Sequence, residues 1–267
     1  MSEVRDPLKD DSAAAGPAGS LAEAQEQLEA GRPVEAARIL ESLVQREPGN
    51  AAAHQELATA LVRLSRHGAA VQAARRALEL DLSLARPHGV LAWVAMNRGR
   101  HQEAEAELRA QLQALPAGGL SRRAAAHNQL GLLYFRQRRY PDAEQALQQA
   151  LALEPERSIP RWNLALLYLQ TRRREEAQRE LERLLTLPEM SPEVAHTARF
   201  NLGHLYACQG RYADAREQFA QALTVHPTFL GRFYRTVPFL ARFSLRILIV
   251  ALLLILLLAW NLFLRRR

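Results

Sequence analysis

Residues 127–155 read HNQLGLLYFRQRRYPDAEQALQQALALEP, and this stretch decides the fold of the 267-residue chain. Its apolar residues recur three and four positions apart on both sides of the central RRYPDA. This spacing predicts two amphipathic helices joined by a tight turn. Gly131 and Ala143 put a small residue on each helix, where the two must approach closely. The stretch therefore predicts a packed helical hairpin.

The turn of this hairpin recurs along the chain with a nearly constant period. Six copies stand 34, 34, 39, 34 and 38 residues apart, a period typical of repeat proteins. They are GRPVEA from Gly31, SRHGAA from Ser65, GRHQEA from Gly99, RRYPDA from Arg138, RRREEA from Arg172 and GRYADA from Gly210. Because no single hairpin can bury its apolar face alone, we expect six hairpins to stack on one another.

Small and apolar residues fill the same slots around each copy. Every copy ends in alanine, namely Ala36, Ala70, Ala104, Ala143, Ala177 and Ala215. Another small residue stands upstream in the later copies, as Ala58, Ala92, Gly131, Ala165 and Gly203. These residues predict close contact between the two helices of each hairpin.

These repeated residues resemble the tetratricopeptide repeat (TPR) family. The resemblance places repeats at 17–50, 51–84, 85–118, 124–157, 158–191 and 196–229, after an N-terminal segment, 1–16, that we expect to be disordered. It implies an all-α fold, a right-handed α-solenoid of six TPR helix pairs with a concave groove. The insertions 119–123 and 192–195 fall between repeats, where a loop is tolerated.

Composition and charge exclude several classes of protein. The single cysteine, Cys208, excludes an internal disulfide and a multi-cysteine metal site. The net charge of +7 comes from residues 218–267, which hold seven arginines and no acid, whereas residues 1–217 balance 28 basic against 28 acidic residues. Since the excess surrounds one hydrophobic segment, we expect a membrane and no nucleic acid as partner.

The C-terminal part of the chain predicts a membrane anchor. Residues 247–264 read ILIVALLLILLLAWNLFL, and a helix over 245–264 is long enough to span a bilayer. A juxtamembrane amphipathic segment, 230–243, precedes it, and 265–267 form a basic tail. The expected interfacial residues are Arg246, Trp260, Arg265, Arg266 and Arg267.

The N-terminus lacks the apolar core of a secretory signal. We therefore expect a single-pass membrane protein whose N-terminal domain is cytoplasmic. A bacterial inner membrane is the favoured location, and a mitochondrial outer membrane is the alternative.

No catalytic constellation, phosphate-binding loop or metal-ligand cluster stands out, so we expect neither an enzyme nor a cofactor, metal or small-molecule substrate. His54, His88 and His127 share one slot of successive repeats, which favours packing over metal binding.

Arginine fills one turn slot in all six repeats, where it complements a helix dipole. The alternative is a basic edge that contacts lipid or an acidic partner. The arginines of this slot are Arg32, Arg66, Arg100, Arg139, Arg173 and Arg211.

The resemblance implies a ligand groove lined by the first helix of each repeat, which would bind a protein or peptide partner. Its candidate residues are Trp93, Met96, Asn128, Leu132, Phe135, Arg136, Trp162, Leu166, Leu169, Phe200 and His204. Some of these side chains can instead pack within their own repeat. A clamp for acidic chaperone tails is disfavoured, since only Asn163 matches its slots.

The sequence thus predicts a membrane-tethered scaffold or adaptor. The alternatives are a membrane-bound receptor or co-chaperone for client proteins, and an accessory subunit of a membrane enzyme complex.

Overall fold

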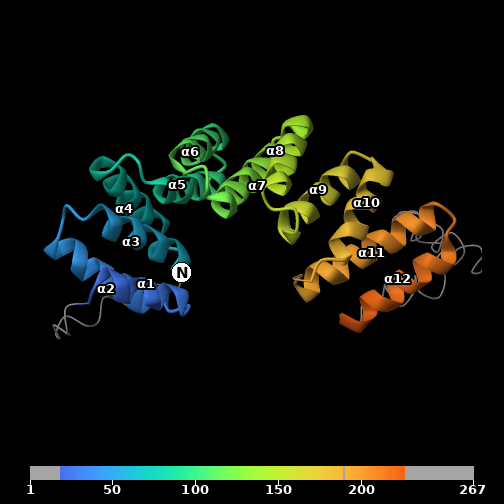
Figure 1. The fold of residues 1–267 in the computed structure, drawn as a ribbon, viewed down its shortest axis with the longest axis horizontal. Helices are drawn as coiled ribbons and strands as arrows, with labels where there is room; N and C mark the ends of the chain where they lie inside the picture. The colour runs from blue at the N-terminus through green and yellow to red at the C-terminus, as the bar shows by residue number, and fades with distance from the viewer. Residues whose placement is uncertain (1–18, 189, 226–267) are drawn as a thin grey trace, which may run out of the picture. The chain divides into compact units, whose positions relative to one another are not determined.

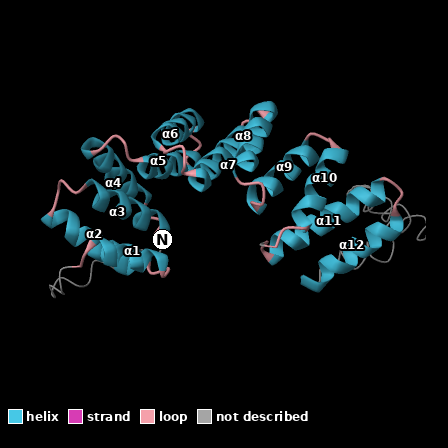
Figure 2. Cartoon of the chain, in the orientation of Figure 1, coloured by secondary structure: helices cyan, strands magenta, loops and turns pink. Residues whose placement is uncertain are grey.

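The computed structural model describes residues 19–188 and 190–225, and these residues form twelve α-helices and no strand (Figure 2). The helices are α1 (Leu21–Glu29), α2 (Pro33–Arg46), α3 (Ala51–Arg63), α4 (His67–Leu80), α5 (Ala85–Asn97), α6 (His101–Ala114), α7 (Leu120–Arg136), α8 (Tyr140–Leu153), α9 (Ser158–Gln170), α10 (Arg174–Leu185), α11 (Pro192–Cys208) and α12 (Tyr212–Val225). Each expected repeat therefore contains one pair of helices, and the all-α fold is confirmed for the described residues.

The chain divides into two compact units, Met1–Glu154 and Pro155–Arg267. In the first unit, α1 to α8 form four successive helix pairs, and each pair packs on the next through α2 with α3, α4 with α5 and α6 with α7 (Figure 1). In the second unit, α9 with α10 and α11 with α12 form two pairs, which meet through α10 and α11. Such stacking of neighbouring hairpins is the architecture of a helical solenoid.

The turn inside each hairpin has the same backbone conformation in all six repeats. Its first residue adopts a positive φ: 72°, 70° and 79° at Gly31, Gly99 and Gly210, but also 58° to 61° at Ser65, Arg138 and Arg172. The next backbone N–H, that of the slot arginine, donates to the carbonyl oxygen five residues earlier over 2.8 to 2.9 Å. This pairing satisfies a carbonyl at the end of the first helix. The repeated six-residue pattern thus encodes a left-handed turn that reverses the chain.

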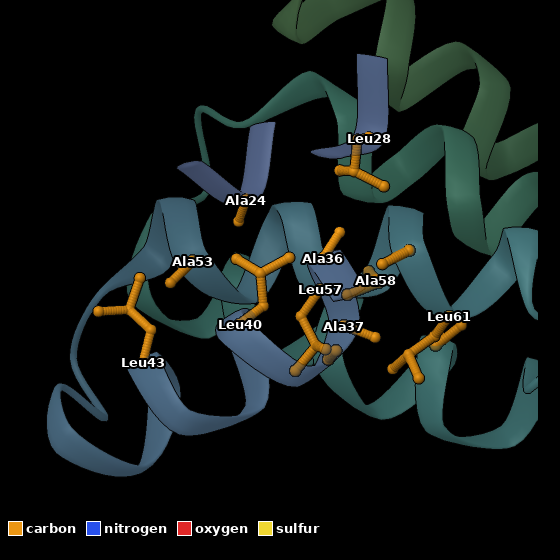
Figure 3. Packing of buried hydrophobic residues seen from close by; sticks show 14 of the residues in the cluster. Ala24, Leu28, Ala36, Ala37, Leu40, Leu43, Ala53, Leu57, Ala58 and Leu61 are labelled. Atoms are coloured by element: carbon orange, nitrogen blue, oxygen red, sulfur yellow. The ribbon is translucent and has the colours of Figure 1, made fainter. Parts of the chain in front are cut away.

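Small residues bring the two helices of each pair together, as the sequence predicts. The last alanine of all six turn patterns has no exposed surface. A Cβ atom added to Gly131 would lie 2.6 Å from Cγ of Leu147, and one added to Gly203 would lie 2.8 Å from Cε1 of Phe219. Figure 3 shows the same packing in the first repeats, where Leu40 and Leu57 interdigitate among alanines.

The two insertions, at positions where a loop would be tolerated, are helical instead. Residues 120–123 and 192–195 are helical and lengthen α7 and α11 to 17 residues each. Ser191 caps α11 by accepting a hydrogen bond from the Val194 N–H, and Pro192 follows at a position that suits proline. The cap supports the extra helical turn of α11, whereas α7 begins after Gly119 without a side-chain cap.

Several predictions fall on residues outside the described part of the chain. These are the disordered segment 1–16, the end of the last repeat at 226–229, the juxtamembrane segment 230–243, the transmembrane helix 245–264 and the tail 265–267, with Arg246, Trp260, Arg265, Arg266 and Arg267. Among the described helices, none is long and apolar enough to cross a membrane.

Candidate functional site

In the first unit, the predicted groove residues lie on α5 and α7. Trp93 is the most accessible aromatic among them, with 36% of its surface exposed, and its ring meets His67 edge-on at 5.0 Å. Phe135 is half-buried, with its ring centroid 6.0 Å from that of Tyr140. Met96, Asn128 and Leu132 are half-buried, and Arg136 is exposed. Trp93 therefore offers the largest aromatic surface to a partner.

In the second unit, the predicted groove residues lie on α9 and α11. Trp162, Leu166 and Leu169 are half-buried. Phe200 packs edge-on against the buried Phe219 of α12, with ring centroids 5.4 Å apart, so its side chain contributes to the core of its own repeat. Burial, with a smaller contribution from Arg174, lowers the pKa of His204, whose Nδ1 lies 3.7 Å from the Cys208 sulfur. The role of these groove residues in binding a partner stays a prediction.

A polar pocket of about 440 Å³ lies between the first helices of the first three repeats. Gln25, Leu28 and Glu29 of α1, Glu56, Thr59 and Arg63 of α3, and Arg86 of α5 line it. The groove positions of these repeats are thus polar, whereas most of the candidate groove residues predicted from the sequence are apolar or aromatic. None of the candidate groove residues predicted from the sequence lines this pocket.

Glu56 lies at the base of the pocket and is only 3% exposed. Its Oε1 accepts hydrogen bonds from Arg86 Nη1, from Gln25 Nε2 at 3.3 Å and from Gln55 Nε2 at 3.4 Å. These contacts join the first helices of three successive repeats. The available sequence signal is the pair of opposite charges at Glu56 and Arg86, which the repeat register brings to neighbouring helices.

The turn arginines of the last three repeats are held by contacts within the fold. The guanidinium groups of Arg139, Arg173 and Arg211 lie 4.1 to 4.4 Å from the ring centroids of Tyr134, Tyr168 and Tyr206. Each also donates through Nε, over 2.6 to 2.9 Å, to a carboxylate three residues later, that of Asp142, Glu176 or Asp214. The slot therefore stabilises the turn, which favours the structural interpretation of these arginines over a basic edge.

Tyrosine hydroxyls extend two of these clusters to the preceding repeat. Tyr134 donates to Glu105 at 3.0 Å, and Tyr206 donates to Glu182 at 2.9 Å. Burial, and next the hydrogen bond to Glu182, raise the pKa of Tyr206 to about 12. The clusters therefore couple one repeat to the next.

The three histidines that share a slot have separate surroundings. His54 Nε2 lies 3.2 Å from the Pro48 carbonyl, and His88 Nδ1 lies 2.7 Å from Glu107. Burial, followed by the charge of Arg123, lowers the pKa of His127. Within the described ranges, no three His, Cys, Asp or Glu side chains gather as a metal site.

Stacked antiparallel helix pairs with a left-handed turn define a helical repeat protein. Three family models, each described as tetratricopeptide repeat, match residues 27–81 and 134–199, residues 90–158, and residues 196–229. Together they cover well over half of the chain, which belongs to the tetratricopeptide repeat family.

Solved structures share this fold at low sequence identity. The chain is similar to pilF of Pseudomonas aeruginosa (18% identity, TM-score 0.67, 82% of this chain and 95% of that chain) and to PilW (20%, 0.65, 78% and 92%). It is also similar to YrrB (19%, 0.57, 75% and 98%). No curated protein matches the sequence at a significant level.

Proposed function

We propose that this chain is a membrane-tethered scaffold whose first helices bind a protein or peptide partner. The proposal rests on the polar pocket between α1, α3 and α5 and on the accessible Trp93 of α5, which lies outside the pocket lining and meets His67 of α4. Tryptophan and arginine side chains are enriched among the hot spots of protein interfaces. TPR folds commonly bind protein or peptide partners and are generally not catalytic. The absence of an enzymatic activity stays a prediction.

The tether is proposed from the sequence. Residues 247–264 carry no charge, and Asn261 is the one polar group among them. Arginines flank the run on both sides, which suits a helix that crosses a bilayer. We further propose that the repeats lie on the cytoplasmic side, with a bacterial inner membrane favoured over a mitochondrial outer membrane.

The similar structures support the binding part of the proposal. YrrB is described as a TPR protein with an unusual peptide-binding site, and PilW as a widely conserved type IV pilus biogenesis factor. We take from YrrB only the class of ligand, a peptide. Identities of 18% to 20% support a common fold, so the identity of the partner must come from experiment.

Photo-crosslinking in native membranes tests the binding surface. A photoreactive phenylalanine analogue at Trp93 should capture a small number of stoichiometric partners. The same analogue at Gln72, which is exposed on α4, should capture none of them. Equal capture at both positions would refute the proposed surface. Capture of many unfolded proteins would favour the receptor or co-chaperone, and capture of a single membrane enzyme the accessory subunit.

Deletion of residues 244–267 tests the tether separately. The truncated chain should appear in the soluble fraction, whereas the full chain should resist carbonate extraction. If the truncated chain still resists extraction, the anchor does not lie in residues 244–267.

A further inference from the structure

Two charged side chains of the described residues are buried, Glu56 at 3% and Glu180 at 8% exposure. Glu180 has a guanidinium on each carboxylate oxygen: Arg161 Nη1 lies 2.7 Å from Oε2, and Arg183 Nη1 lies 3.1 Å from Oε1. A buried carboxylate is stable only when its charge and its lone pairs are both satisfied. Glu180 meets this requirement from within the fold.

The partly buried Glu105 follows the same pattern. Arg109 Nη2 lies 2.7 Å from its Oε1, and Arg139 Nη1 lies 2.9 Å from its Oε2. The fold therefore has two examples, one in each unit, of an interhelical glutamate paired with two arginines. Both oxygens of each carboxylate are engaged.

Glu56 is more deeply buried than either but has only half of this arrangement. Arg86, Gln25 and Gln55 all donate to Oε1. Within residues 19–188 and 190–225, no donor lies on Oε2. Oε2 is not among the fully buried side-chain atoms that lack a partner, so it is accessible to solvent, and a ligand in the pocket can bring a donor to it.

The rest of the pocket also presents acceptors to a ligand. Glu29 is exposed at the pocket wall and has no ion-pair partner among the described residues. The Thr59 hydroxyl donates to the Gln55 carbonyl at 3.2 Å, which leaves its oxygen lone pairs to accept. Arg63 and Arg86 already donate, to the Leu28 carbonyl and to Glu56 respectively. Both guanidiniums keep further N–H groups, but the free acceptors of the pocket, Glu56 Oε2, the Glu29 carboxylate and the Thr59 oxygen, suit a ligand with several N–H donors.

We propose that this pocket binds an arginine side chain of the partner, which would supply the second guanidinium to Glu56. The inference rests on the proposed function, because it names the chemistry that the binding surface recognises. A guanidinium carries five N–H donors in a planar fork, so it can reach Glu56 Oε2 and Glu29 together. The pocket volume of about 440 Å³ admits such a side chain. An acidic side chain would have to pair with the N–H groups that Arg63 and Arg86 leave unused, and the test therefore includes an acidic probe.

The test uses the full chain in detergent micelles with ¹⁵N-labelled glutamine, so that the side-chain amides of Gln25 and Gln55 report on the pocket. The probe is Nα-acetyl-argininamide, and its matched control is Nα-acetyl-citrullinamide, which has nearly the same shape and no charge. The arginine probe should shift both amide signals saturably. The citrulline probe should bind at least about tenfold more weakly, since a charge-assisted hydrogen bond is replaced by a neutral one.

Two variants locate the binding to the carboxylates. Glu29→Gln, which breaks no ion pair of the described fold, should weaken the arginine probe several-fold, whereas Glu26→Gln, on the same helix but outside the pocket, should not. Glu56→Gln should abolish binding. Circular dichroism checks its fold, and Glu29→Gln keeps the test decisive if Glu56→Gln unfolds.

Equal affinity for the arginine and citrulline probes would overturn the inference. So would a stronger shift with the acidic probe, the α-amide of Nα-acetyl-glutamic acid. So would full binding to the Glu29→Gln variant. The probe titration needs no partner. Failure to crosslink a partner at Trp93 would therefore refute the proposed function, while saturable binding of the arginine probe would still support the pocket.

Discussion

The left-handed turn residue makes a sharp prediction, because three repeats place glycine there and three do not. Ser65, Arg138 and Arg172 adopt φ values of 58°, 60° and 61°, and all three side chains are exposed. A residue with a Cβ atom loses roughly 1–2 kcal/mol in this conformation. Glycine avoids that loss, but it gives the unfolded chain more conformational entropy, which lowers the free energy of unfolding by about 0.4–1 kcal/mol. Each substitution to glycine should therefore stabilise the fold by about 0.5–1 kcal/mol.

Thermal and urea unfolding of the full chain in detergent, followed by circular dichroism, measure this gain. One kcal/mol corresponds to roughly 2–4 °C in the midpoint for a domain of this size. Ser65 and Arg138 lie in the first unit and Arg172 in the second, so their effects should add when the three changes are combined.

The reverse substitution supplies the control. Gly99 has a φ of 70° and nothing within 4 Å of an added Cβ, so Gly99→Ala should destabilise the fold by about 1 kcal/mol through backbone strain alone. Gly68 lies within α4, also with open space around it, and Gly68→Ala should stabilise the fold by up to about 1 kcal/mol. If the two alanine substitutions have the same effect, the turn argument is wrong.

Three further predictions follow from packing, titration and binding. Gly203→Ala should destabilise the fold by about 1–3 kcal/mol in urea unfolding, since the added methyl overlaps a buried phenylalanine ring, whereas Gly118→Ala should leave it nearly unchanged. The raised pKa of Tyr206, about 12, means that the folded state holds this proton while the unfolded state loses it from about pH 10. Stability should therefore fall between these pH values, and less so in Tyr206→Phe; identical alkaline profiles would contradict this. Trp93→Ala should weaken binding of the partner identified by crosslinking by about 2 kcal/mol or more. Arg172→Ala, at an exposed turn residue, should weaken it by less than about 1 kcal/mol. The opposite order would assign binding to the turn edge.

Much of the fold could be predicted from the sequence, because a helix pair has a short and local code. The period of the turn pattern, the small residues Ala143 and Gly131, and the apolar spacing all act within one repeat. The insertions were harder to interpret, since a loop and an extra helical turn have similar lengths. At the second insertion, the Ser191 hydroxyl caps α11 and favours the helical turn.

The candidate site could be predicted only in part, because it depends on contacts between repeats. Trp93 stands out in the sequence as a large side chain in a groove slot, and the structure leaves it accessible. The pocket around Glu56 requires side chains from three helices, and its chemistry depends on which carboxylate oxygen each donor reaches. Periodicity contains no information at that level.

The arginine of the turn slot has different contacts in the first three and the last three repeats. In the last three repeats, the residue five positions earlier is Tyr134, Tyr168 or Tyr206, and each ring lies within 4.4 Å of the guanidinium carbon. In the first three repeats, Gln27, Leu61 and Ala95 occupy that position and offer no aromatic ring. Carboxylates also hold Arg66 and Arg100 in the first three repeats, through Glu41 and Glu103, so the tyrosine ring is what distinguishes the last three. The half-paired Glu56 lies in the first three repeats, which is why we place recognition there.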